Sequence, residues 1–229
     1  MARSRDLIKN SSEGAFVYAK DGHEINNIQS LRAETWRAME DSVYSGKCKS
    51  IGVSNFTVQH LEALRKTARI WPPAVNQIEF HPYNPQTELV EYCQKHGIVV
   101  QAYASLGGQD CGKKRWNILG GKLVDREEIC QVSRKYGKTA AQVLLKWARE
   151  QGHIVIPKST NIDHLRDNLE AISDDSWHLD NEDMALIASI DETVDIMTSS
   201  DMTKDENEKK NEKTRLCWVR DPLKMLDFE

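Results

Sequence analysis

Apolar residues recur with two different spacings along the chain, and the spacing switches repeatedly from residue 31 onward. Four short apolar runs predict buried strands: "SIGVS" at 50–54, "AVNQIEF" at 74–80, "IVVQAYA" at 98–104 and "HIVIP" at 153–157. Between these runs, apolar side chains return every three or four residues, which is the period of a helix with one buried face. These predicted helices cover 31–45, 57–68, 84–97, about 125–136, a stretch that opens at Thr139, about 162–172 and 181–191.

Residues that favour helix starts stand where the helical spacing begins. Asn84 is predicted to cap one helix, with Pro85 in its first turn. Thr139 and Gln142 have the spacing of a capping box, and Asp180 precedes the last predicted helix. These positions support the helix boundaries that the apolar spacing predicts.

Strands and helices therefore alternate along most of the chain. This order predicts βαβ units and a parallel sheet, an α/β fold with right-handed crossovers. Because helices cover both faces of most parallel sheets, we expect these strands to be buried on both faces.

The two ends of the chain differ from this pattern. Residues 1–30 show no clear period, so we expect an irregular segment there. Residues 195–215 are polar and charged, and we expect them to form a mobile loop. The last stretch, "LCWVRDPLKMLDFE", is apolar again and is expected to dock on the body. The sequence thus predicts two parts, 1–30 and 31–229.

The composition argues against several classes of protein. The formal net charge is −4, and hydrophobic residues make up 39% of the chain in short runs. Neither a nucleic-acid-binding surface nor a membrane span is therefore predicted. The five cysteines have no C-x-x-C spacing, which indicates reduced thiols in a cytoplasmic protein and no metal site.

Several stretches, taken in order, resemble the aldo-keto reductase family: "ETWRAMEDSVYSGKCKSIGVSNFT", "PAVNQIEFHPY", "VVQAYASLG", "GKTAAQVLLKWA" and "VIPKSTNIDHLRDNL". The tail "LCWVRDPL" is also similar to the family's C-terminal segment. The resemblance implies a (β/α)8 TIM barrel that binds NADP(H) without a Rossmann domain. It identifies the four predicted strands as barrel strands five to eight. Since a whole barrel takes about 250 residues or more, we expect an N-terminally truncated, partial barrel with its C-terminal segment.

The resemblance places the nicotinamide end of the cofactor site on three strand ends and the loop after the last of them. Its residues are Ser54, Asn55, Gln77, Tyr103, Ser105 and Leu106. The first three match family positions that hydrogen-bond the carboxamide, a group that needs both donors and acceptors. The tyrosine matches the ring that stacks on the nicotinamide, and the last two residues begin the loop over the pyrophosphate.

A second group follows the fourth strand, where a helix is predicted to begin near Asn161. Its residues are Lys158, Ser159, Thr160, His164 and Asn168. A helix N-terminus attracts phosphate through its N–H groups and partial positive charge. By resemblance, the first residues would meet the 2′-phosphate of NADP(H), and the asparagine would contact the adenine. The family often has Arg where this chain has His164, which is a weaker cation near neutral pH. We therefore expect weaker or pH-dependent binding of the phosphate.

The family's catalytic groups are not carried over to any residue of this chain. In the family, a Tyr donates the proton beside a Lys, an Asp and a His, all from the first four strands. Tyr18, Lys20, Asp21 and His23 crowd into "VYAKDGHE", whereas groups that converge on one atom should come from different strand ends. We interpret this cluster as a solvated loop.

Three interpretations of function stay open. The chain is an NADP(H)-dependent oxidoreductase that reduces aldehydes or ketones with help from a second subunit, a catalytically silent NADP(H)-binding or partner-binding relative, or a non-functional truncated product. The first interpretation takes a small carbonyl compound as substrate. Unpaired edges of strands five and eight would invite another chain, including a homodimer of two half barrels.

Overall fold

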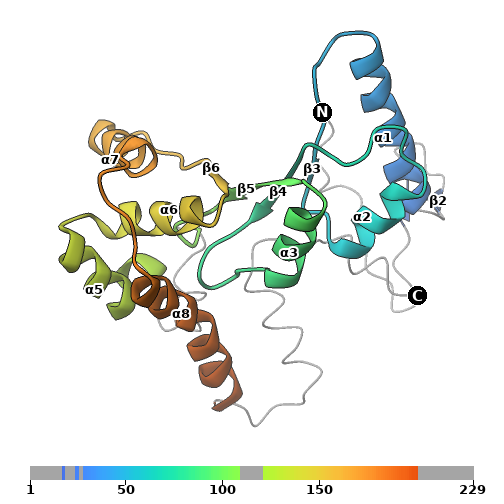
Figure 1. The fold of residues 1–229 in the computed structure, drawn as a ribbon. Helices are drawn as coiled ribbons and strands as arrows, with labels where there is room; N and C mark the ends of the chain where they lie inside the picture. The colour runs from blue at the N-terminus through green and yellow to red at the C-terminus, as the bar shows by residue number, and fades with distance from the viewer. Residues whose placement is uncertain (1–16, 19–23, 26–27, 109–120, 201–229) are drawn as a thin grey trace.

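The computed structural model describes residues 17–18, 24–25, 28–108 and 121–200 (Figure 1). Strands and helices alternate in it, as the apolar spacing predicts. In chain order the elements are β1 (Val17–Tyr18), β2 (Glu24–Ile25), α1 (Ile28–Tyr44), β3 (Val53–Ser54), α2 (Val58–Arg65), β4 (Val75–Glu79), α3 (Thr87–Lys95), β5 (Val99–Tyr103), the 3-10 turn η2 (Leu123–Asp125), α5 (Glu127–Tyr136), α6 (Ala140–Glu150), β6 (Ile154–Val155), α7 (Ile162–Ser173) and α8 (Asn181–Ser200).

Four of the strands form one parallel sheet in the order β3-β4-β5-β6. The register places Ser54 opposite Gln77, Gln77 opposite Gln101, and Ala102 opposite Val155. Each connection between neighbouring strands contains at least one helix, as parallel pairing requires. The predicted parallel α/β fold is confirmed, and the consecutive strand order is that of one side of a barrel.

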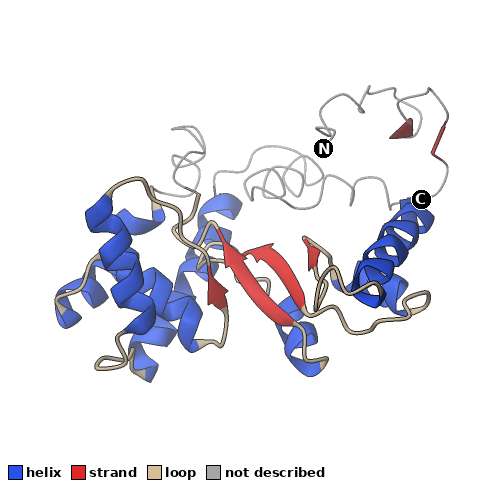
Figure 2. Cartoon of the chain, turned by 90° about the horizontal axis from the view of Figure 1, so that it is seen from above, coloured by secondary structure: helices blue, strands red, loops and turns tan. Residues whose placement is uncertain are grey.

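Helices cover one face of this sheet (Figure 2). Along that layer α1 contacts α2, α2 contacts α3, and α5 contacts α6, which in turn contacts α7. The core lies between the helices and the sheet, where Ile78 and Val100 are buried. Phe80 stacks on Trp147 of α6 with 5.0 Å between ring centroids. Burial of these large side chains is the main stabilising term for the half barrel.

The opposite face of the sheet, which we call the inner face, is less covered than predicted. Val99, Ile154 and Ile156 are 41%, 45% and 41% exposed, so the expectation that the strands are buried on both faces is wrong for these positions. Side chains alternate between the two faces of a strand. In a closed barrel, inward side chains from the other strands would fill this side.

Two of the predicted helix caps are confirmed. Thr139 accepts a hydrogen bond from the Gln142 N–H at 3.2 Å, and the Gln142 side chain accepts one from the Thr139 N–H at 2.9 Å. Asp180 accepts from the Asp183 N–H at 2.9 Å at the start of α8. Side-chain oxygens thus satisfy donors that would otherwise lack a partner within the helix.

The predicted start of α3 is wrong. The helix begins at Thr87 rather than near Asn84, and its cap residue Gln86 has a left-handed φ of 45°. The Asn84 side chain instead donates to the Glu79 carbonyl at 3.4 Å. A bridge between His81 and Asn84 forms a turn here, and this turn delays the helix.

The chain ends also differ from the prediction where they are described. Val17 pairs with Ile25 in a short antiparallel ladder, and α1 already begins at Ile28, so residues 1–30 are not wholly irregular. Helix α8 continues to Ser200, so the predicted loop over 195–215 starts later than expected. Its remainder and the apolar C-terminal stretch lie outside the described residues. Of the four residues that we interpret as a solvated loop, only Tyr18 is described, in β1; Lys20, Asp21 and His23 lie outside the described residues.

Helix α1 is fixed to the loop before β4. Glu40 is fully buried and accepts hydrogen bonds from the Arg69 N–H at 2.6 Å, the Ile70 N–H at 2.8 Å and the Arg69 guanidinium at 2.8 Å. Trp36 donates from its indole nitrogen to the Ile70 carbonyl at 3.2 Å. These contacts hold α1 in the helix layer beside α2.

Among the described helices, none has the length and apolarity needed to cross a membrane.

Candidate cofactor site

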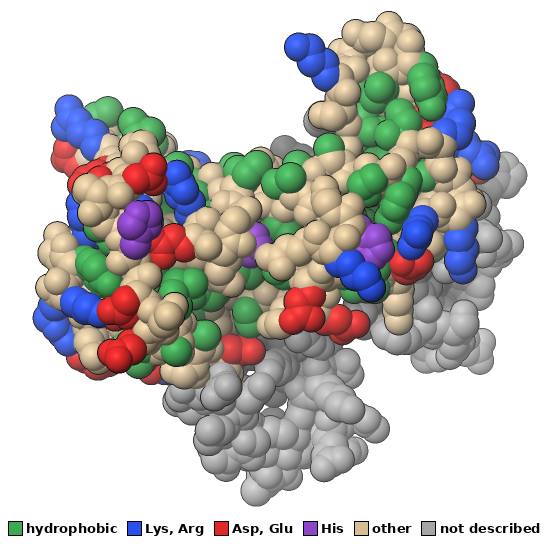
Figure 3. Space-filling view, viewed as in Figure 1, with side chains coloured by type: hydrophobic (Ala, Val, Ile, Leu, Met, Phe, Trp, Pro, Cys, Tyr) green, Lys and Arg blue, Asp and Glu red, His purple; other side chains and the backbone are tan. Residues whose placement is uncertain are grey.

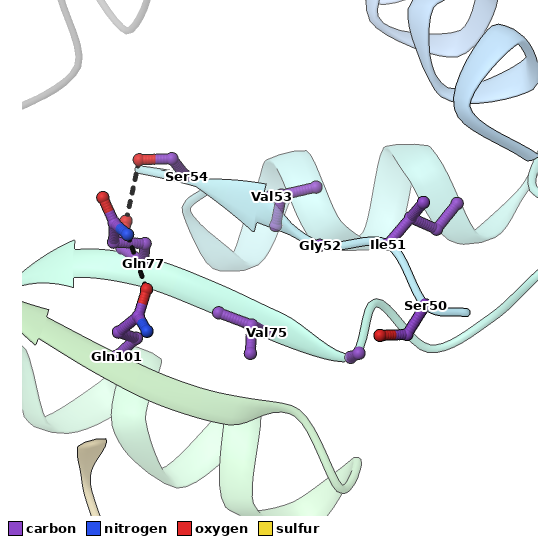
Figure 4. A pocket seen from close by; sticks show the side chains of 9 residues that line it. Ser50, Ile51, Gly52, Val53, Ser54, Val75, Gln77 and Gln101 are labelled. Atoms are coloured by element: carbon purple, nitrogen blue, oxygen red, sulfur yellow. Dashed lines mark hydrogen bonds between the residues drawn. The ribbon is translucent and has the colours of Figure 1, made fainter. Parts of the chain in front are cut away.

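Polar side chains lie side by side across three strands of the inner face (Figure 4). The Ser54 hydroxyl donates to the Gln77 carbonyl at 3.0 Å, and the Gln77 amide nitrogen donates to the Gln101 amide oxygen at 2.5 Å. The parallel register places all three on one face because side chains alternate along each strand. Gln101 was missed by sequence reasoning, although its spacing of two from Tyr103 puts both on the same face.

Asn55 and Tyr103 form a second contact at the same edge. The Tyr103 hydroxyl donates to the Asn55 side-chain oxygen at 3.0 Å. Asn55 has a left-handed φ of 58°, a conformation that asparagine tolerates better than most residues, and its N–H donates to the Gln77 carbonyl at 2.9 Å. The predicted residues Ser54, Asn55, Gln77 and Tyr103 are thus brought together.

Asn76 supports this group from the helix-facing side of the sheet, and sequence reasoning missed it. It is fully buried, its amide nitrogen donates to the Phe56 carbonyl at 2.8 Å, and its oxygen accepts from the Phe56 N–H at 3.3 Å. Both polar groups of Phe56 are therefore held, which fixes the turn that carries Asn55. A polar residue on the buried face of a strand was the available signal.

Replacing Asn76 with leucine is expected to lower the free energy of unfolding by about 1–3 kcal/mol, because both backbone groups of Phe56 lose a buried partner. Urea unfolding of the wild type and the variant measures the difference. A change within about 0.5 kcal/mol would contradict the role given to Asn76.

The next predicted residues, Ser105 and Leu106, follow β5. Ser105 is buried and its hydroxyl donates to the Ala102 carbonyl at 3.3 Å. Leu106 packs against the hydrophobic core. In this structure both side chains are engaged with the body of the protein, and residues 109–120 lie outside the described part of the chain.

The second predicted group lies around the start of α7. Asn161 caps the helix by accepting from the N–H groups of Asp163 at 2.8 Å and His164 at 3.5 Å. The Ser159 hydroxyl accepts from the Asn161 N–H at 3.1 Å. A phosphate bound at this end would therefore share these donors with the Asn161 side chain.

The charged and polar members of this group differ in exposure. Lys158, Thr160 and His164 are exposed, whereas Asn168 is buried. Arg166 is paired with Asp163 at 3.0 Å on the exposed surface of the helix. Lys158 and His164 are thus the basic side chains that a ligand could reach without breaking this ion pair.

The two groups follow the order of the strands. Ser54 ends β3, Gln77 lies in β4, Tyr103 ends β5, and Lys158 follows β6. In a parallel sheet all four carboxyl ends meet at one edge, which is where barrel enzymes build their sites. The arrangement offers amide, hydroxyl and aromatic groups at one end and a cation at the other.

An open cavity of about 410 Å³ lies beside β3, but it coincides only in part with this site. It is lined by residues 50–54, Ala74, Val75, Gln77 and Gln101 (Figure 4). Of the predicted site residues, only Ser54 and Gln77 contribute to its wall. The cavity extends toward the strand starts, so it belongs to the inner face rather than to the carboxyl edge.

The described residues offer no metal site, and the buried Cys93 thiol is not activated. They contain no group of three or more His, Cys, Asp and Glu side chains that could hold a metal ion. Burial raises the pKa of the Cys93 thiol to about 11, although a hydrogen bond with Asn76 lowers it in part. Cys93 is therefore a protonated core residue at neutral pH.

Comparison with known proteins agrees with this geometry. The model of the "Aldo/keto reductase family" matches residues 15–192, more than half of the chain. An NAD(P)H-dependent D-xylose reductase of Pyricularia oryzae is 39% identical over 181 residues, which are 77% of this chain and 54% of that protein. Aldose reductase B of Dictyostelium discoideum is 38% identical over 184 residues, 80% of this chain and 54% of that protein.

Solved structures show the same relation. An aldo-keto reductase complexed with NADPH matches with a TM-score of 0.63 at 32% identity, covering 77% of this chain and 51% of its own. An aldo-keto reductase from a deep-sea metagenome matches with a TM-score of 0.63 at 35% identity, covering 72% of this chain and 56% of its own. The chain thus spans about half the length of the relatives it matches. It belongs to the aldo/keto reductase family.

Proposed function

We propose that this chain binds NADP(H) along the carboxyl edge of its sheet and serves in the reduction of an aldehyde or ketone to an alcohol. When bound, the cofactor supplies the hydride. The residues of this chain would bind and orient it, and we assign no catalytic acid to them. The relatives that suggest the activity are named as NAD(P)H-dependent or as aldose reductases.

The observation that carries this proposal is the hydrogen-bonded group at the ends of β3, β4 and β5. The Tyr103 hydroxyl engages the Asn55 oxygen, and the Gln77 nitrogen engages Gln101. Within the described contacts, the side-chain nitrogen of Asn55 can still donate and the side-chain oxygen of Gln77 can still accept. A primary carboxamide needs that pair, and the Tyr103 ring lies at the same edge to stack on the nicotinamide.

The phosphate end would lie at the start of α7. Lys158, Ser159, Thr160 and His164 surround a helix N-terminus, where backbone dipoles favour an anion. We assign the 2′-phosphate to Lys158 because its ammonium is exposed after β6. Ser105, Leu106 and Asn168 keep the pyrophosphate and adenine roles that the resemblance implies only as part of this proposal.

Calorimetric titration of the purified chain with NADPH at low salt tests the proposal. We expect a dissociation constant on the order of micromolar. Absence of binding by a sample whose circular dichroism shows a folded protein would overturn it. The titration needs no substrate, so it separates cofactor binding from reductase activity.

Replacing Lys158 with alanine is expected to weaken NADPH binding about tenfold and NADH binding much less, because a charge-assisted contact to the 2′-phosphate is lost. The control is Lys95→Ala, which removes an exposed lysine from α3, far from this edge in the fold. Equal losses for both nucleotides would contradict the assignment of Lys158 to the 2′-phosphate.

A second candidate is a catalytically silent relative that binds NADP(H) or a partner. The exposed apolar side chains on the inner face favour it, because such a surface invites another polypeptide. Carbonyl reduction would then need acid groups from that polypeptide, either a second copy joined through the open sheet edges or a different chain. Reductase assays with and without the partner distinguish these cases from a chain without function.

A further inference from the structure

Two glutamine side chains on neighbouring strands of the inner face are paired in one sense. The Gln77 amide nitrogen donates to the Gln101 amide oxygen at 2.5 Å, and Figure 4 shows the Gln77 oxygen on the side away from Gln101. A primary amide carries its donors on one atom and its acceptor on another. Because the nitrogen of Gln77 is directed at Gln101, its oxygen is the atom that a ligand can approach.

The position of Gln101 in the sheet favours this single pairing. In the register it stands opposite Gln77 of β4 on one side and opposite Ile154 of β6 on the other. Cross-strand partners share one face of the sheet, so an apolar side chain lies on its second side. Among the contacts that the described residues make, the Gln101 oxygen accepts from Gln77 alone. This contact should hold the Gln77 amide in one of its two orientations.

The surroundings of this pair are uncharged. The cavity beside Gln77 and Gln101 is lined, among the described residues, by Ser, Gln, Gly and aliphatic residues. Charged side chains gather instead over the helices, as the face drawn in Figure 3 shows. A ligand group that reaches Gln77 is therefore selected by hydrogen bonding and not by a cation in the cavity wall.

We propose that Gln101 is a positioning residue that makes the site select a carboxamide against a carboxylate on the pyridine ring of the nucleotide. It acts through Gln77, whose oxygen it keeps toward the ligand. A carboxamide donates an N–H to that oxygen, whereas a carboxylate would set acceptor against acceptor. The inference rests on the proposed binding of NADP(H) and names the group that its nicotinamide end recognises.

Two nucleotides that differ only in this group test the role of Gln101. Calorimetric titration of the purified chain compares NADP⁺ with nicotinic acid adenine dinucleotide phosphate, which carries a carboxylate in place of the carboxamide. We expect the wild type to bind NADP⁺ about a hundredfold more tightly, because the acid leaves the Gln77 oxygen without a donor. Gln101→Met keeps the side-chain length but removes the amide acceptor, so Gln77 can turn its nitrogen to the acid. The preference should then fall to about tenfold or less.

A second variant separates this role from packing. In Gln101→Glu, a carboxylate oxygen can still accept from the Gln77 nitrogen, so the preference should stay at or above that of the wild type. Gln94→Met, at an exposed position of α3, should leave it unchanged. Glu79 lies two residues after Gln77 and is present in every variant, so a changed preference reports Gln101.

The outcomes distinguish this inference from the proposed function. Equal affinity of the wild type for both nucleotides, or a preference that Gln101→Met leaves unchanged, would overturn the inference and leave cofactor binding intact. Equal loss of the preference in Gln101→Met and Gln101→Glu would also overturn it, because packing would then explain both. A folded wild type that binds neither nucleotide would overturn the proposed function, and this role with it. Circular dichroism of each variant identifies a folding defect.

Discussion

Replacing Glu40 with alanine is expected to lower the free energy of unfolding by about 2–4 kcal/mol. The carboxylate is fully buried and is the acceptor for the Arg69 N–H, the Ile70 N–H and the Arg69 guanidinium. Its removal leaves two backbone donors and the Arg69 Nε–H without their acceptor. Urea unfolding followed by circular dichroism measures the loss.

Asp41 provides a matched control on the same helix. Its carboxylate also contacts the Arg69 guanidinium, at 2.6 Å, but its side chain is 67% exposed. Asp41→Ala should therefore cost no more than about 1 kcal/mol. If the two alanine variants lost the same stability, the buried contacts of Glu40 could not be what fixes α1.

The Glu40 carboxylate should also make the free energy of unfolding fall in acidic solution. Burial raises the pKa of its carboxyl, but the hydrogen bonds from Arg69 and from the backbone of Ile70 outweigh burial and lower it overall. A lowered pKa in the folded state means that the unfolded chain binds the proton more readily. The contribution is thus present above the ordinary value of 4.5 and is lost as the pH falls through the folded pKa.

Local order was predictable from the sequence because it depends on spacing. The four apolar runs are each found as a strand, and Thr139 with Gln142 caps α6 as the capping-box spacing predicts. Asn84 shows the limit of such reasoning. Its type and position favour a helix cap, but a turn with His81 engages it, and the helix begins later.

The residues of the site that stand at the ends of single strands could be predicted from the sequence. Ser54, Asn55, Gln77 and Tyr103 come together because the parallel register aligns the ends of β3, β4 and β5. The spacing of Gln101 from Tyr103 gives its face of the sheet, but its hydrogen bond with Gln77 joins two strands and depends on their register.

The open inner face was not predictable from composition. Val99 and Ile154 have the apolar character of strands covered on both sides, yet both are exposed in the half barrel. Their sequence fits the environment of a closed barrel.

His153 is the group that should set stability in mildly acidic solution. It directly precedes β6 and is buried, with its ring edge against Phe80 at 4.4 Å between centroids. Its Nε2 atom has no hydrogen-bond partner. Burial lowers its pKa from 6.5 to about 4 because no nearby group compensates the charged form.

We therefore expect the free energy of unfolding to fall by about 2–3 kcal/mol between pH 7 and pH 4.5, at about 1.4 kcal/mol per pKa unit. A histidine in the unfolded chain takes up its proton near pH 6.5, whereas His153 in the folded chain resists until about 4. The contribution of neutral His153 to the free energy of unfolding is thus fully present above pH 6.5 and is lost progressively below it.

His153→Phe should remove this pH dependence, because an apolar ring can fill the same place against Phe80. His178→Gln is the control, since the His178 side chain is 64% exposed. Urea unfolding at pH 7.0, 6.0, 5.0 and 4.5, with steps of about one pKa unit or less, compares the three proteins. Parallel profiles for the wild type and His153→Phe would show that proton uptake at His153 does not drive the acid limb.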